Sequence, residues 1–123
     1  LQTPLLSEGL NISLGQRLRI LIARAILEKP QLLILDEAFI GTDERTKLKI
    51  LDNLFDRSLP WTVMNISHDA EVVVMTDTIH VLKAGGIVES GSAQELARAS
   101  SSTFRLLFPE LTRQILQKPG GGR

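Results

Sequence analysis

The stretch Leu32-Leu33-Ile34-Leu35-Asp36-Glu37 decides the fold, because four large aliphatic residues run directly into two carboxylates. Four consecutive aliphatics favour a strand that is buried on both faces, as in a parallel sheet covered by helices. Such a strand brings Asp36 and Glu37 to the carboxyl edge of the sheet, where open α/β folds bind their ligands. Carboxylates at this edge can hold Mg²⁺ through its water shell or orient an attacking water. Alternatively, the Asp caps the next helix.

Composition and charge narrow the class of protein. The chain has 123 residues, of which 43% are hydrophobic and 23% charged, as in ordinary soluble globular proteins. Its 14 basic and 14 acidic residues give a formal net charge of zero, which argues against a nucleic-acid partner held by bulk electrostatics. The absence of Cys excludes disulfides and thiolate metal sites. No stretch reads as a membrane span or a signal peptide, and a first residue other than Met leads us to expect a longer parent protein.

Hydrophobic periodicity and turn residues predict alternating helices and strands. A first helix, capped by Asn11 or Ser13, should end before Pro30. The next elements expected are a strand at 32–36, a helix from Asp43 to about Ser58, a strand at 62–66 and a short helix at 69–75. Strands at 78–82 and 87–89 should then form a hairpin around a Gly85-Gly86 turn. A helix from a Ser92/Glu95 capping box to about Arg98 and helical pieces at 104–108 and 111–116 complete the expected elements. We expect a domain at 1–99 and, after a linker-like break at Ser100–Ser102, a helical extension and tail at 100–123.

Two groups of polar residues stand at ends of these elements. Strand–helix–strand units with short loops give parallel strands, so the ends of the strands at 32–36 and 62–66 should share one edge. Glu37 and His68 are then expected within reach of one shared phosphate. A second group, Ser13-Leu14-Gly15-Gln16, opens a helix whose free N–H groups and dipole favour an anion, with Gly15 allowing close approach. Taken alone, that tetrapeptide also fits a plain capped helix start.

Together these motifs resemble the second half of an ATP-binding cassette (ABC) ATPase, over about residues 8–97. Residues 12–16 are similar to the family signature, usually Leu-Ser-Gly-Gly-Gln, and residues 32–36 resemble the Walker B strand. Residues 40–43 stand in the place of the D-loop, and residues 78–95 resemble the segment that closes such domains. The run Arg19 to Ile26 looks most like exporter cassettes.

The resemblance implies an α/β fold, namely a partial P-loop NTPase-type parallel sheet with flanking helices that forms the C-terminal part of an ABC cassette. It also implies roles in binding and hydrolysing ATP with Mg²⁺. Asp36 would hold Mg²⁺ through water, Glu37 would orient or deprotonate the attacking water, and His68 would contact the γ-phosphate. The signature residues would contact ATP held by a second, opposed cassette, and a D-loop residue would signal across that interface; these residues are Ser13, Gly15, Gln16 and Asp43.

The sequence departs from the family pattern at several places. Leu14 replaces the first signature Gly, Leu18 stands where Gln is common, and Ile40-Gly41-Thr42 replaces Ser-Ala-Leu before the D-loop Asp. No Gly-x-x-x-x-Gly-Lys-Ser/Thr loop occurs, and neither do the adenine-stacking aromatic and the Gln loop of the family.

Three functions fit these observations. The first is the ATPase domain of an ABC transporter that powers export, at the cytoplasmic face of the cell membrane, with a second cassette in a head-to-tail dimer and transmembrane domains as partners. The second is a non-transport cassette in DNA maintenance or translation, against which the zero net charge counts. The third is a non-catalytic or regulatory cassette that acts by dimerisation. In the first case the parent hydrolyses ATP, whereas this chain alone is expected to be inactive.

Overall fold

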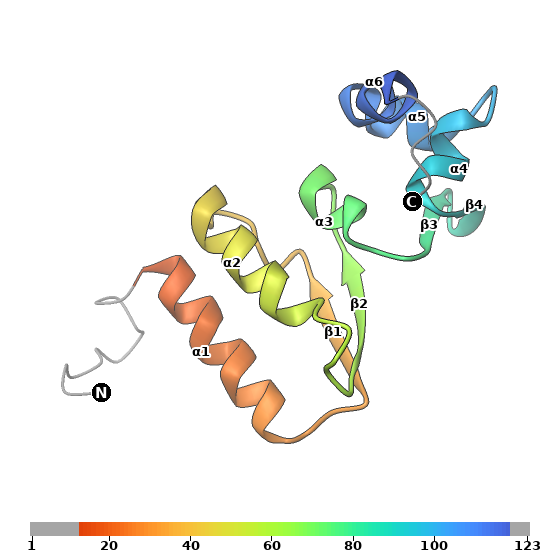
Figure 1. Cartoon of the computed structure of the whole chain (residues 1–123). Coiled ribbons are helices and arrows are strands. Elements are labelled where there is room, and N and C mark those ends of the chain that lie inside the picture. The colour runs from red at the N-terminus through yellow and green to blue at the C-terminus, as the bar shows by residue number, and fades with distance from the viewer. Residues whose placement is uncertain (1–12, 119–123) are drawn as a thin grey trace. The chain divides into compact units, whose positions relative to one another are not determined.

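The computed structural model describes residues 13–118 and divides the chain into two compact units, Leu1–Ser67 and His68–Arg123 (Figure 1). The proposed cap Asn11 and the signature residue Ile12 lie outside the described residues. The domains expected from the sequence, 1–99 and 100–123, do not coincide with these two units, and this division stays a prediction. None of the helices within residues 13–118 combines the length and the apolar character that crossing a bilayer requires.

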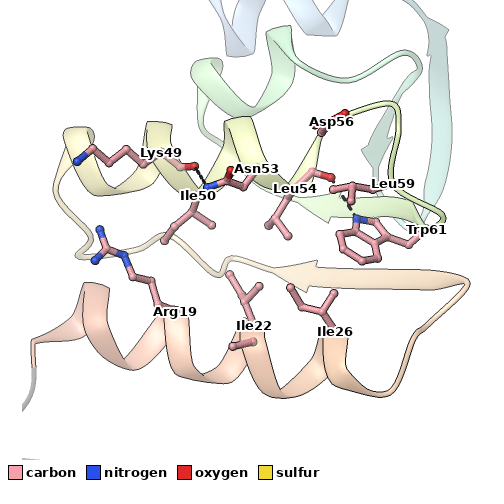
Figure 2. Close-up of a pocket in the computed structure, with 11 residues that line it drawn as sticks. Arg19, Ile22, Ile26, Lys49, Ile50, Asn53, Leu54, Asp56, Leu59 and Trp61 are labelled. Carbon is pink, nitrogen blue, oxygen red and sulfur yellow. Dashed lines mark hydrogen bonds between the residues drawn. The ribbon is translucent and has the colours of Figure 1, made fainter. Parts of the chain in front are cut away.

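The first unit is a helix–strand–helix–strand arrangement. Its elements are α1 (Leu14–Leu27), β1 (Leu32–Asp36), α2 (Glu44–Leu54) and β2 (Thr62–Ile66). The strands pair in parallel, from Leu32 opposite Thr62 to Asp36 opposite Ile66, which confirms both predicted strands and their shared edge. Between the two helices, Ile22 of α1 faces Ile50 and Leu54 of α2, and all three side chains are buried (Figure 2).

The strand β1 is buried on one face only, which corrects the expectation from its aliphatic run. Leu33 and Leu35 are each 6% exposed, whereas Leu32 and Ile34 are 50% and 56% exposed. Successive side chains of a strand point to opposite faces, and α1 and α2 lie together on one side of the two strands (Figure 1). Within the described residues, this sheet therefore has one packed face and one apolar face open to solvent.

The second unit combines a hairpin with short helices. Its elements are α3 (Ala70–Val74), β3 (Ile79–Lys83), β4 (Gly86–Gly91), α4 (Ala93–Arg98), α5 (Thr103–Leu107) and α6 (Pro109–Gln117). The strands β3 and β4 are antiparallel, which confirms the predicted hairpin. Within the described residues, the expected parallel sheet consists of β1 and β2. Positive φ angles at Ala84 (50°) and Gly85 (82°) place the turn one residue earlier than predicted, as a type I′ turn requires.

The core of the second unit forms around Phe104, whose side chain is fully buried. Its ring centroid lies 5.3 Å from that of Phe108. The buried residues in this cluster are Val73, Val81, Ala93, Leu96, Ala97, Phe104 and Leu111. The segment predicted as a linker-like break contributes directly, because Ser102 is buried and its hydroxyl accepts a hydrogen bond from the Arg105 N–H, which caps α5. The predicted capping box of Ser92 and Glu95 is confirmed.

The carboxylate of Glu89 ties β4 to the start of α5, a contact that sequence patterns did not indicate. It accepts hydrogen bonds from the backbone N–H of Thr103 at 2.7 Å and of Phe104 at 2.9 Å. The Ser102 hydroxyl donates to the same carboxylate at 3.4 Å. A negative charge at a helix N-terminus also interacts favourably with the helix dipole. Glu89 therefore satisfies backbone donors that the first turn of any helix leaves unpaired.

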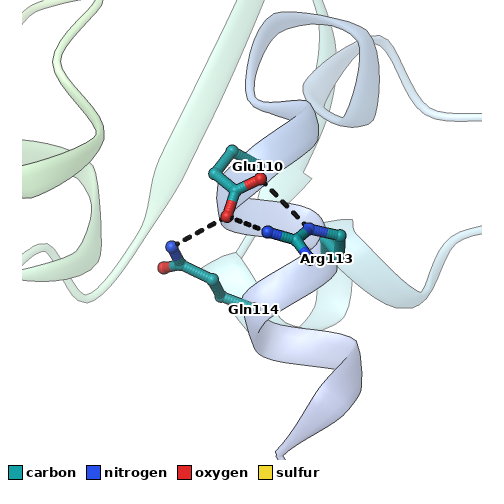
Figure 3. Close-up of polar contacts among 3 residues, drawn as sticks. All are labelled: Glu110, Arg113 and Gln114. Atoms are coloured by element: carbon teal, nitrogen blue, oxygen red, sulfur yellow. Dashed lines mark hydrogen bonds and ion pairs between the residues drawn. The ribbon is translucent and has the colours of Figure 1, made fainter.

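Replacing Glu89 by Ala should destabilise the second unit, because two partly buried N–H donors lose their acceptor. We expect a loss of about 1–3 kcal/mol in the free energy of unfolding, measured by urea denaturation. Glu110→Ala is the matched control, since within residues 13–118 the Glu110 side chain pairs only with exposed Arg113 and Gln114 on the surface of α6 (Figure 3). Such surface pairs contribute little, so equal losses in the two variants would refute the role given to Glu89.

Candidate functional site

The two carboxylates predicted from the sequence lie where β1 ends. Asp36 is exposed and Glu37 is half-buried. Glu37 has a φ of 46°, and its backbone N–H donates to the carbonyl oxygen of Ile66 at 2.9 Å. A residue other than Gly in this left-handed region carries backbone strain, and such residues cluster at functional sites. The chain thus fixes the Glu37 backbone by a bond between the tips of two strands.

The predicted histidine follows the second of these strands by two residues. Ile66, the last residue of β2, pairs with Asp36, which confirms that both strands end at the same edge. His68 opens the second unit. Its approach to Glu37, and a phosphate shared between them, remain a prediction.

The acidic residues at the end of β1 fit a metal site that a ligand completes better than a site built by the protein alone. Within residues 13–118, no group of three or more His, Cys, Asp or Glu residues is placed to hold a metal ion. Mg²⁺ in phosphate-transferring proteins is commonly bound by one or two carboxylates, with waters and substrate phosphates completing its shell. Asp36 therefore fits an ion that arrives with a nucleotide, rather than a cage made by this part of the chain alone.

The start of α1 is ordered by a reciprocal capping box. The Ser13 hydroxyl accepts a hydrogen bond from the Gln16 N–H at 3.1 Å, and the Gln16 side-chain oxygen accepts one from the Ser13 N–H at 3.0 Å. The box uses only the acceptor atoms of these side chains. The Ser13 hydroxyl hydrogen and the Gln16 side-chain amide are thus the donors that an anion at this terminus would meet.

Gly15 has a packing role that sequence reasoning missed. It is buried, and a Cβ added to it would lie 2.9 Å from Cγ2 of Thr46 in α2. Real Cβ atoms essentially never approach other heavy atoms that closely, so a larger residue at position 15 requires the Thr46 methyl group or one of the two helices to shift. No short-range sequence signal marks this contact, because Gly15 and Thr46 are far apart in the chain.

Asp43, predicted to act in the D-loop, caps α2. Its carboxylate accepts a hydrogen bond from the Thr46 N–H at 2.9 Å. This bond lowers the pKa of Asp43, and the positive charge of Arg19 makes a smaller contribution in the same direction. Asp43 therefore keeps its charge to lower pH than an ordinary Asp, at the positive end of the α2 dipole. A role across a dimer interface remains a prediction.

Leu14 and Gly41, two residues that depart from the family pattern, lie against each other. Gly41 has a φ of 78°, and a Cβ at this position would lie 2.8 Å from Cδ1 of Leu14. The Leu14 side chain is half-exposed and flexible, so it could move aside, whereas the positive φ would strain any residue other than Gly. The unusual signature residue thus lies against the unusual D-loop residue.

Comparisons with known proteins point to one family. The model of the family described as "ABC transporter" matches residues 1–40. The chain is 43% identical over 95 residues to a lactococcin transport/processing ATP-binding protein from Lactococcus lactis, covering 77% of this chain and 13% of that protein. It also matches the structure of a bacterial Atm1-family ABC exporter with ATP bound, with a TM-score of 0.74, 32% identity, and coverage of 86% of this chain and 18% of the exporter.

The chain belongs to the ABC transporter ATP-binding cassette family. The recognition made from the sequence is therefore confirmed. The cassette is also 35% identical over 96 residues to an Fe(3+) ions import ATP-binding protein from Brucella melitensis, covering 76% of this chain and 27% of that protein. The chain spans less than a third of the length of each of these three relatives. The roles given to its individual site residues remain predictions.

The contact between Gly15 and Thr46 can be tested by comparing the effect of Gly15→Ala on stability with and without the Thr46 methyl group. Gly15→Ala should lower the free energy of unfolding by about 1 kcal/mol, because overpacking outweighs the higher helix propensity of Ala. Thr46→Ser removes Cγ2 but keeps the backbone N–H that Asp43 binds. In the Thr46→Ser background, Gly15→Ala should be neutral or stabilising in urea denaturation. An equal loss in both backgrounds would show that the methyl group of Thr46 does not constrain Gly15.

Proposed function

We propose that this cassette supplies the hydrolytic carboxylates and the signature helix of an ATP-driven exporter. The observation that carries the proposal is the position of Glu37. It directly follows Asp36 at the end of β1, it has a left-handed backbone, and its N–H is bonded to Ile66. A backbone fixed in this way limits where the carboxylate can lie, and catalysis of phosphoryl transfer is mostly positioning and charge stabilisation.

In the proposed mechanism each residue has one task. Asp36 would hold Mg²⁺ that enters with ATP, and the ion would neutralise charge on the phosphate oxygens. Glu37 would accept a hydrogen bond from the attacking water and orient or deprotonate it. His68 would donate to the γ-phosphate, which links that group to Glu37.

The proposed partners follow from what the chain presents. Ser13, Gly15 and Gln16 would meet the γ-phosphate of ATP held by a second cassette, in a head-to-tail dimer. Asp43 would lie at the interface between the two cassettes. Transmembrane domains would complete the transporter, with the cassette at the cytoplasmic face of the membrane. We propose no nucleic-acid partner, because the formal net charge is zero.

The direction of transport is supported by similarity. Arg19 to Ile26 looks like exporter cassettes, and the lactococcin transport protein and the Atm1-family exporter are both relatives. The similarity to an iron import protein points the other way. We favour export because a solved structure that the chain matches is an exporter and because Arg19 to Ile26 looks like exporter cassettes.

A regulatory or dimerising cassette is the second candidate. It is favoured by Leu14 at the first signature Gly. A non-transport ABC ATPase is a further alternative within the same family. The pair Asp36 and Glu37 at the strand end supports the catalytic proposal over both the regulatory reading and a purely structural one.

Glu37→Gln tests the catalytic role in a full-length transporter that carries this cassette. Gln keeps the shape and the hydrogen bonding of the side chain but removes the base, so hydrolysis should fall by about a hundredfold or more. Binding of ATP and the ATP-bridged dimer should persist. Glu28→Gln, at the exposed end of α1, is the control and should hydrolyse ATP normally. Wild-type turnover by the Glu37 variant would exclude Glu37 as the catalytic carboxylate.

For the chain of residues 1–123 alone, we expect no measurable ATPase activity and at most millimolar affinity for ATP. The phosphate loop and the adenine-stacking aromatic of the family do not occur in this sequence. A helix N-terminus favours an anion by only about 0.3–1 kcal/mol when exposed, whereas millimolar binding already requires about 4 kcal/mol. Calorimetric titration with MgATP measures the affinity. Saturable micromolar binding would show that other residues of this chain hold the nucleotide.

A further inference from the structure

A groove of about 500 Å³ runs between α1, α2 and the segment that follows α2 (Figure 2). Its volume lies within the range of about 300–1,000 Å³ that is usual for small-molecule sites. Its base is apolar, because Ile22, Ile50 and Leu54 are buried there. The residues that line the groove are Arg19, Ile22, Ala23, Ile26, Lys49, Ile50, Asn53, Leu54, Asp56, Leu59 and Trp61.

One end of the groove is cationic. Arg19 of α1 and Lys49 of α2 lie at that end, and both side chains are exposed (Figure 2). Within residues 13–118, neither side chain forms a hydrogen bond or an ion pair, although the charge of Arg19 acts on Asp43. Asp56 lies toward the opposite end, where its carboxylate accepts hydrogen bonds from the Ser58 hydroxyl at 2.7 Å and the Ser58 N–H at 2.9 Å.

The other end of the groove is walled by an aromatic ring held in one orientation. Trp61 donates its ring N–H to the carbonyl oxygen of Leu54 at 3.1 Å. This bond satisfies the polar edge of the indole within the protein, so the ring face offers apolar surface to the groove. Leu59 and Ile26 are half-buried beside it. The groove therefore changes along its length from two cations to the apolar wall of Trp61, with the carboxylate of Asp56 toward the same end as Trp61.

We propose that this groove binds an amphipathic anion, made of an unbranched alkyl chain and a terminal carboxylate. The carboxylate would lie between Arg19 and Lys49, where charge-assisted hydrogen bonds can form. The alkyl chain would follow Ile22 and Ile26 toward Trp61 and displace water from apolar surface. The site is separate from the strand end at Asp36 and Glu37, and the proposal does not rest on the proposed function.

The charges of the groove select among ligand classes. A cationic amphiphile of the same length would meet Arg19 and Lys49 with like charge, which is unfavourable. In the opposite orientation its head would lie beside Asp56, whose carboxylate already accepts two hydrogen bonds from Ser58. A neutral alcohol would gain the apolar contacts but only weak hydrogen bonds to the two cations. A bare anion such as acetate would lack the chain that covers Ile22 and Trp61. The cationic end and the apolar wall of the groove therefore determine the ligand class together.

Trp61 provides a direct probe, because it is the only Trp in the chain and it lines the groove. Dodecanoate, added below its micelle concentration, should change the Trp61 fluorescence with saturation. Dodecyltrimethylammonium, dodecanol and acetate are the comparison ligands and should bind at least about tenfold more weakly. Equal apparent affinity for dodecanoate and either other dodecyl compound would overturn the proposal, as would the absence of any saturable change.

Variants separate the two halves of the site. The double variant Arg19→Gln/Lys49→Gln should bind dodecanoate about tenfold more weakly, whereas Arg24→Gln, on α1 but outside the groove, should bind it normally. Ala23→Phe adds a ring inside the groove and should abolish saturable binding without removing any charge. Circular dichroism shows whether each variant is folded. Unchanged dodecanoate affinity in a folded Ala23→Phe variant, or in the folded double variant, would overturn the site.

Discussion

The hydrogen bond from the Glu37 N–H to the Ile66 carbonyl oxygen ends the parallel ladder of β1 and β2. The role proposed for Glu37 depends on it, because it fixes where the chain leaves the sheet. A regular strand would send residue 37 onward along β1, whereas the left-handed backbone turns the chain at that point. The carboxylate of Glu37 is therefore carried one residue beyond β1, at a backbone position that is bonded to the neighbouring strand. A defined backbone position helps a group that must orient one water molecule.

Local sequence signals predicted the elements well, because those signals act between neighbouring residues. The run that ends in Asp36 specified β1, and the hydroxyl of Ser13 specified the start of α1 through its bond to the Gln16 N–H. The exposure of Leu32 and Ile34 could not be read in the same way. An aliphatic run shows that a strand is apolar on both faces, but other elements decide which face is covered.

The sequence also proposes the candidate site residues, whose roles stay predictions, but it did not indicate their local geometry. The order of Ser13, Asp36 and His68 in the chain carries the family pattern, whereas Glu37 combines a positive φ with a bond to another strand, which local sequence does not encode. The same holds for Gly15, which sequence reasoning linked to phosphate and which the structure shows packed against Thr46. Contacts between segments that are far apart in the chain leave no periodic signal along it.

The apolar face of the β1–β2 sheet links stability to protein concentration. Leu32, Ile34, Met64 and Ile66 are all about half exposed there, and covering them would remove apolar surface from water. Any species that covers this face, including a second copy of the chain, binds the folded state selectively and stabilises it by mass action. The melting temperature of this chain should therefore be read as a function of its concentration. A single value from a dilute sample would describe the uncovered sheet only.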